Sequence, residues 1–123
     1  MDPIAKARLN SNLLETIAEL LERRVRDPRV QGVTLTGVDV ANDLAVAKVY
    51  YSVLEGEEQR RIAQKGLENV AGFLRGEVGR LLHIRNAPQL RFHYDASLAE
   101  GNRIESLLRK IHDEESTAGD PDA

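Results

Sequence analysis

LENVAGFLRGEVGRLLHIRNAPQLRFHYD, residues 67–95, joins a helical pattern to an alternating strand. The helical part holds Gly72, Gly76 and Gly79 within eight residues. Glycine inside a helix costs roughly 1 kcal/mol relative to alanine, so three of them this close predict a kink or the close approach of another group to the helix backbone. The best candidate for that group is a phosphate.

The sequence pattern predicts a helix and two strands before this stretch and one more helix after it. Apolar residues at helical spacing predict an amphipathic helix over residues 5–26, which Asp27-Pro28 should stop. Runs 30–40 and 44–54, separated by residues 41–43, predict a β-hairpin. The apolar phase shifts across Gly37, which predicts a β-bulge there. Ser97 and Glu100 match a capping box and predict a last helix.

The predicted order is helix, strand, strand, broken helix, strand, helix. Three strands with helices packed on one face form an α+β sandwich. We expect one domain over residues 1–112, because the chain holds 123 residues and shows neither an internal repeat nor a linker. Residues 113–123 are acidic and should form a disordered tail.

Composition excludes several classes of protein. The chain contains no cysteine, which rules out disulfides, thiol catalysis and cysteine-ligated zinc. It holds neither a membrane-length apolar run nor a secretory signal, so a cytoplasmic location is expected. His83, His93 and His112 lack metal-ligand spacing, and no catalytic or nucleotide-binding motif is recognisable. We therefore expect no enzyme activity, cofactor, metal or small-molecule substrate.

The net charge of −3 hides an uneven distribution. The acidic tail carries five acids and no base, and without it the chain has slightly more basic than acidic residues. Basic residues gather in two patches, over residues 23–29 and 75–91. Such runs are most often solvated faces, and nucleic-acid binding is the functional alternative.

Arginine suits RNA binding because its planar fork of donors meets phosphate oxygens and stays charged. Arg75 and Arg80 lie about 140° apart around the helix axis, so they should flank one surface. Arg85 and Asn86 follow in the loop, where Asn86 is suited to a base edge. An ordinary solvated helix position is the alternative for Arg75. A mobile N-terminal arm offers a second candidate contact, through Lys6 and Arg8, although a plain helix start is the favoured account of each residue alone.

We expect the five aromatic residues to lie on different faces of the sheet and helices. Most should lie in the core, namely Tyr51, Phe73, Phe92 and Tyr94. Tyr50 should lie on the opposite face of the sheet from Tyr51, and His93 on the opposite face from Phe92 and Tyr94. An exposed Tyr50 could stack on a base, but so few aromatics argue against a stacking platform.

Several short motifs, in one order, resemble the ribosome-binding factor A family over about residues 6–111. That resemblance implies a bacterial type II KH-like domain that binds the free small (30S) ribosomal subunit and its 16S ribosomal RNA. It also implies a role in late maturation of that RNA, including 5′-end processing, and an association with growth in the cold. We expect a monomer without enzymatic activity. The motifs that carry the resemblance are Asp27-Pro28-Arg29, Val38 with Asn42-Asp43-Leu44, Ala47-Lys48-Val49-Tyr50, Gly72-Phe73-Leu74-Arg75, and Arg85 with Pro88, Leu90, Phe92 and Tyr94-Asp95.

The resemblance also bears on the glycine-rich helix. KH domains clamp a nucleic-acid backbone with a Gly-x-x-Gly loop. In this family a helix-kink-helix with an Ala-x-Gly element replaces the loop, and Val70-Ala71-Gly72 occupy the matching positions, with valine first. Gly76-Glu77-Val78-Gly79 spells Gly-x-x-Gly, but Glu77 would place a carboxylate against phosphate and Val78 fits the apolar stripe. Such a short pattern is weak by itself.

A rival from a different class stays open. The last helix and the acidic tail would suit a protein-interaction module, and removal of residues 113–123 would separate it from the RNA-binding interpretation. A small enzyme with an unrecognised site has no supporting motif.

Overall fold

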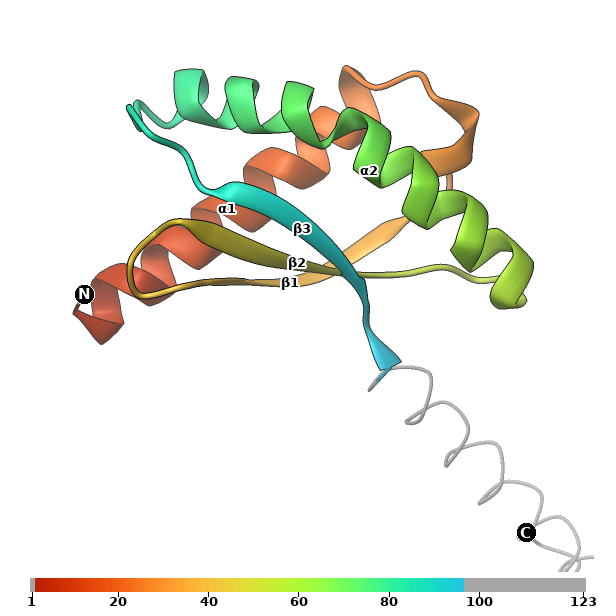
Figure 1. The fold of residues 1–123 in the computed structure, drawn as a ribbon, viewed down its shortest axis with the longest axis horizontal. Helices are drawn as coiled ribbons and strands as arrows, with labels where there is room; N and C mark the ends of the chain where they lie inside the picture. The colour runs from red at the N-terminus through yellow and green to blue at the C-terminus, as the bar shows by residue number, and fades with distance from the viewer. Residues whose placement is uncertain (1, 97–123) are drawn as a thin grey trace, which may run out of the picture.

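The structure, a computed structural model, describes residues 2–96 and places two long helices against a three-stranded sheet (Figure 1). The predicted last helix and the acidic tail lie outside the described residues. In chain order the elements are α1 (Pro3–Arg23), the short 3-10 helix η1 (Pro28–Val30), β1 (Thr34–Val40), β2 (Val46–Ser52), α2 (Gly56–Leu81) and β3 (Gln89–Tyr94).

The sheet has the strand order β1-β2-β3. β1 and β2 form the predicted hairpin and are antiparallel, whereas β3 runs parallel to β2. The parallel direction follows from the connection, because α2 carries the chain back to the starting edge before β3 begins. The register of β1 and β2 shifts between Leu35 and Gly37, which confirms the predicted β-bulge.

α1 begins earlier and ends earlier than the sequence pattern predicts. The Asp2 carboxylate accepts a hydrogen bond from the N–H of Ala5 and caps the helix. Lys6 therefore lies in α1, which confirms the favoured plain helix start, and the alternative of a mobile arm is wrong. The helix ends at Arg23, not near residue 26. Asp27 instead caps η1, where its carboxylate accepts the N–H of Arg29 at 2.9 Å.

α2 is one helix of 26 residues, and Val70, Ala71 and Gly72 lie inside it. The predicted division into two helices is therefore not present in its secondary structure. Its ribbon does change direction near the middle in Figure 1. A kink at Val70-Ala71-Gly72 stays a prediction.

The buried apolar residues of both helices and all three strands form one core. Tyr51 and Phe92 lie in it as predicted, and Tyr94 packs against it partly buried. The prediction that Phe73 lies in the core is wrong, because 43% of this residue is exposed. Leu74 faces the core, and Phe73 is rotated about 100° from it around the helix, toward solvent. The fully buried members with the largest side chains are Leu13, Ile17, Val40, Val49, Tyr51, Leu67, Leu74 and Val78.

Candidate nucleic-acid interface

The chain reverses direction at the end of α2. His83 adopts a left-handed backbone with φ of 55°, and the N–H of Ile84 donates to the carbonyl oxygen of Gly79 at 2.9 Å. This bond joins the second residue beyond the C-cap residue Leu82 to the last turn of the helix, which is the Schellman pattern of helix ends. It folds residues 84–87 back along the side of α2.

The returning loop and the last turns of α2 enclose a groove of about 500 Å³. Within it Gly72 and Gly76 are open, since a Cβ added at either would meet nothing within 4 Å. A ligand that entered the groove would therefore meet bare helix backbone at these two positions. The lining residues of this glycine groove are Gly72, Arg75, Gly76, Gly79, Arg80, Ile84, Arg85, Asn86 and Ala87.

Gly79 differs from the two open glycines. A Cβ at this position would lie 3.1 Å from the carbonyl oxygen of Ile84 and 3.5 Å from the Cβ of Ala87. The group that approaches Gly79 is thus the protein's own loop, not the phosphate that the sequence suggested. The expectation of an approaching phosphate applies only to Gly72 and Gly76.

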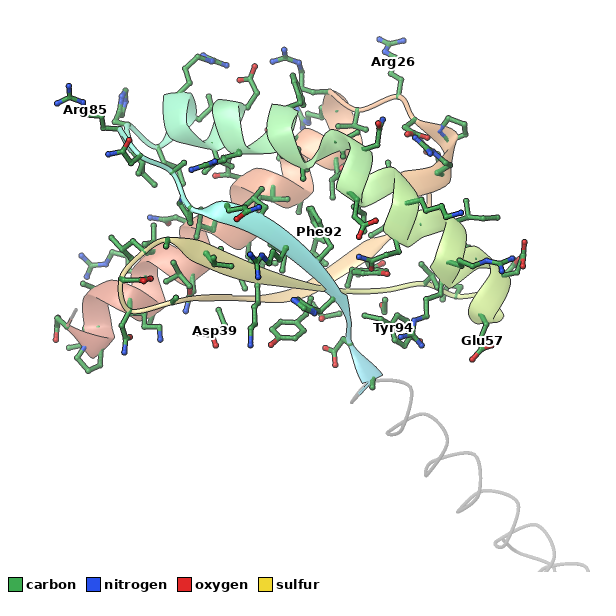
Figure 2. All side chains as sticks on the ribbon, in the orientation of Figure 1. Arg26, Asp39, Glu57, Arg85, Phe92 and Tyr94 are labelled. Carbon is green, nitrogen blue, oxygen red and sulfur yellow. The ribbon has the colours of Figure 1, made fainter. Side chains whose placement is uncertain are left out.

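The arginines on the groove are held to different degrees. The Nε of Arg75 donates to the carbonyl oxygen of Ala87 at 2.9 Å, which fixes the guanidinium beside the groove and leaves its terminal nitrogens available. Arg85 and Asn86 are exposed on the loop, and Figure 2 shows Arg85 projecting from one end of the molecule. Arg75 and Arg85 also offset the partial negative charge at the carboxyl end of α2.

Arg80 is paired within the protein. Its Nε and a terminal nitrogen donate to the Glu77 carboxylate at 3.0 and 2.6 Å. The same carboxylate lies 3.7 Å from the guanidinium of Arg24, which also stacks 5.9 Å above the ring of Phe73. Sequence reasoning missed this cluster, although the spacing of Glu77 and Arg80 was a readable signal for an ion pair.

The literal Gly-x-x-Gly pattern does not form a phosphate loop. Val78 is fully buried in the core, and Glu77 is bound to two arginines. Both observations agree with the sequence-based reasons for setting this pattern aside. The pattern spans the last turns of a regular helix, where Gly76 faces the groove and Gly79 faces the loop.

The structure does not bring Lys6 or Arg8 into the glycine groove. The Nζ of Lys6 lies 3.3 Å from Oδ1 of Asn42 and 3.5 Å from Oδ1 of Asp39, so this lysine links α1 to the β-hairpin. Arg8 is exposed and has no ion pair among the described residues. The first turn of α1 and the loop after α2 nevertheless lie at the same end of the molecule (Figure 1).

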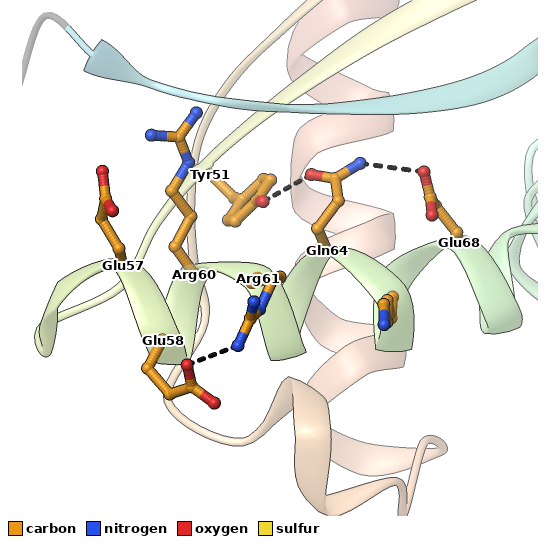
Figure 3. A pocket seen from close by; sticks show the side chains of 8 residues that line it. Tyr51, Glu57, Glu58, Arg60, Arg61, Gln64 and Glu68 are labelled. Atoms are coloured by element: carbon orange, nitrogen blue, oxygen red, sulfur yellow. Dashed lines mark hydrogen bonds and ion pairs between the residues drawn. The ribbon is translucent and has the colours of Figure 1, made fainter.

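A second hollow, of about 550 Å³, lies beside the first half of α2 (Figure 3). Gln64 lies at its centre, accepts a hydrogen bond from the Tyr51 hydroxyl and donates to Glu68 and to the carbonyl oxygen of Phe92. Burial raises the pKa of the Tyr51 phenol. Acids and bases alternate around the rim, which makes this hollow a poor match for a polyanion. The remaining lining residues are Glu57, Glu58, Arg60, Arg61 and Lys65.

Two further observations concern residues 2–96 alone. They contain no group of three or more histidine and acidic side chains placed to hold a metal ion. Neither long helix in this part of the chain has an apolar stretch that would cross a bilayer.

These features define a small α+β domain with a basic, glycine-lined groove along its second helix. The sequence matches the family model described as ribosome-binding factor A over residues 5–108. It is 44% identical over 110 residues to a ribosome-binding factor A from Syntrophobacter fumaroxidans, covering 88% of this chain and 94% of that one. The chain therefore belongs to the ribosome-binding factor A family.

Solved structures agree with that assignment. The crystal structure of ribosome-binding factor A from Thermus thermophilus matches with a TM-score of 0.65 and 28% identity, over 72% of this chain and 93% of that one. A homology model of the Thermus thermophilus factor, fitted into the cryo-EM map of its 30S complex, matches with a TM-score of 0.53 and 27% identity. It covers 72% of this chain and 89% of that one.

Proposed function

We propose that this protein binds the free small ribosomal subunit through the glycine groove. The 16S ribosomal RNA backbone would lie across Gly72 and Gly76, with Arg75 and Arg85 on its phosphates. The observation that carries the proposal is the pairing of two bare helix positions with fixed and free arginines in one groove. The Thermus thermophilus relative fitted into a 30S complex supports the choice of partner.

Each groove residue has a separate role in this proposal. Arg75 is pre-positioned by its bond to the loop, so it loses little freedom when it meets phosphate. Arg80 exchanges part of its pairing with Glu77 for a phosphate oxygen. Asn86 faces a base edge, where its amide both donates and accepts. Lys6 and Arg8 add weaker contacts at the same end of the molecule.

The finer family properties belong to the same proposal. The domain is a type II KH-like domain, and Val70-Ala71-Gly72 form the kink that stands in for its loop. It assists late maturation of 16S ribosomal RNA, including 5′-end processing, by binding rather than by catalysis. A cytoplasmic location, a monomeric state and a link to growth in the cold stay predictions.

Co-sedimentation with purified 30S subunits over a range of salt concentrations tests the groove. Replacing Arg75, Arg80 and Arg85 together by alanine should weaken binding and lower the salt slope by about 2 to 3, because each phosphate contact contributes roughly 0.7 to 0.9. Replacing Arg23, Arg61 and Lys65 removes the same charge outside the groove and should change the slope little. Equal loss in both variants would reduce the interaction to net charge and reject the groove.

The maturation role needs its own experiment. Subunits purified from cells that lack the factor should bind this protein more tightly than mature subunits do, since an assembly factor must leave the finished particle. Equal binding to both would reject the assembly role and leave general RNA binding. Removing residues 113–123 should preserve binding, whereas a protein-interaction module acting through that tail would lose it.

A further inference from the structure

The face of the sheet turned away from the helices carries a pair of rings. The parallel register of β2 and β3 sets Tyr50 beside His93, with ring centroids 6.0 Å apart and planes tilted by 39°. Both residues alternate with buried neighbours, Val49 and Phe92 among them, so both belong to the outer face. Neither ring is used by the core or by the glycine groove.

The β-bulge opens one flank of this pair. Gly37 on β1 lies directly opposite Tyr50, and a Cβ added there would meet nothing within 4 Å. The strand position that would normally place a side chain against the tyrosine ring is therefore empty. A flat group the size of a base gains access to the ring along this side.

Two cationic side chains lie next to the ring pair on the same face of the sheet. The register places Lys48 beside Arg91, two residues before Tyr50 and His93. Both are exposed, and neither forms an ion pair within residues 2–96. Asp39, across from Lys48, has its charge partly balanced by Lys6 at 3.5 Å, and Figure 2 shows its side chain directed away from α2. Lys48 and Arg91 therefore place two positive charges on one side of the rings, while the Asp95 carboxylate, two residues beyond His93, accepts a hydrogen bond from the Thr36 hydroxyl at 2.6 Å.

We propose that this outer sheet face is a second RNA site, which holds an unpaired base on Tyr50 and the adjoining phosphates on Lys48 and Arg91. A flat ring with an open flank and two unpaired cations at neighbouring strand positions suits single-stranded RNA. A protein partner would be expected to use a larger apolar patch than this face offers. The site lies on the side of the sheet opposite α2, so it binds a different RNA segment from the glycine groove.

The test measures binding of the full chain to a labelled single-stranded uridine decamer by fluorescence anisotropy. Tyr50→Ala should weaken binding roughly 5- to 100-fold, the range that loss of one stacked base produces. Tyr50→Phe keeps the ring and should bind within about twofold of the unchanged protein, by the same stacking argument. Gly37→Thr fills the open flank and should weaken binding. Because Gly37 does not adopt a left-handed backbone, the threonine can be introduced there without backbone strain.

Three results would overturn the proposal. One is equal binding by the unchanged protein and Tyr50→Ala. Another is a loss with Tyr50→Phe as large as with Tyr50→Ala, which would assign the effect to the hydroxyl. The third is an absence of change in the ring NMR signals of Tyr50 and His93 at saturating decamer, as expected if another part of the chain covers this face. Subunit binding by the Arg75, Arg80 and Arg85 variant reports on the glycine groove separately, so either site can fail alone.

Discussion

The two halves of α2 differ in what their glycines and polar side chains do. In the first half, Gly66 is packed so tightly that an added Cβ would lie 2.8 Å from the Cβ of Arg29 and 2.9 Å from Cγ1 of Val30. In the second half, Gly72 and Gly76 face open space. The Gln64 amide of the first half likewise forms hydrogen bonds within the protein, whereas Arg85, in the loop that follows the second half, projects into solvent (Figure 2). The second half also contributes Leu74 and Val78 to the core and packs Gly79 against the loop, but its outer side opens two glycines onto a groove.

The largest expected effect on stability comes from a substitution that disrupts the packing of the first half of α2. Gly66→Val should lower the free energy of unfolding by about 2 kcal/mol or more, because the new side chain overpacks the contact with η1. Thermal unfolding should show a loss of roughly 10 °C. Asn69→Val, an exposed position on the same helix, is the matched control and should change Tm little. A Gly66 variant as stable as this control would remove the distinction between the halves.

A smaller effect, of opposite sign, is expected where the second half ends. His83→Gly should raise the free energy of unfolding by about 1 kcal/mol, since glycine tolerates the left-handed backbone that His83 adopts. His83→Ala keeps the Cβ and should bring no such gain. Chemical denaturation of the three proteins measures the difference. If the alanine variant gained as much as the glycine variant, the stabilisation would not come from backbone conformation.

Each half of α2 contains an ion pair that can be removed by one substitution, and the two variants can be compared directly. Glu77→Gln releases Arg80 and Arg24 beside the groove and should steepen the salt slope of 30S binding by up to about 0.9. Glu58→Gln releases Arg61 in the first half and should leave the slope unchanged. Glu58→Gln should cost less than about 1 kcal/mol of stability, as the loss of an exposed ion pair does. Glu77→Gln should cost more, because the Glu77 side chain is only 17% exposed and meets two arginines. A similar slope change in both would mean that position along α2 is irrelevant.

The smallest effect concerns the turn that packs against Gly66. Hydrogen bonds from the side chain and the backbone N–H of Arg29 lower the pKa of Asp27 below its ordinary value. The carboxylate therefore adds stability above the unfolded pKa, and this contribution is lost as the pH falls through the folded pKa. Asp27→Asn should lower Tm slightly at neutral pH, and the difference should vanish in acid. A difference that persisted at low pH would assign the effect to the shape of the turn.

The sequence predicted those features that depend on local periodicity. The shift of apolar phase across Gly37 located the β-bulge, and the alternation in β2 and β3 placed Tyr51 and Phe92 in the core. The glycine spacing and the following arginines drew attention to the stretch that lines the groove, although the groove itself was not predicted. These signals were readable because each one lies within a few neighbouring residues.

Features that depend on distant neighbours were not predicted. Phe73 fits the apolar stripe, yet Arg24, the residue that follows α1, lies over its ring at the surface. The carbonyl oxygen of Ala87 fixes Arg75, and Ile84 fills the space beside Gly79, through a turn that depends on the unusual backbone of His83. Tyr50 and His93 meet only because β3 runs parallel to β2 in one register. Spacing alone does not determine such contacts.

The most direct test of the groove is the double variant Gly72→Ala, Gly76→Ala, studied by thermal unfolding and by 30S binding together. Alanine should stabilise the helix by about 0.5 to 1 kcal/mol at each site, because both positions are open. Ser11→Ala, exposed on α1, is the matched control for helix propensity. We expect the double variant to melt at a higher temperature and to bind 30S subunits at least about tenfold more weakly. A more stable protein with unchanged 30S affinity would contradict the proposed role of the glycine groove.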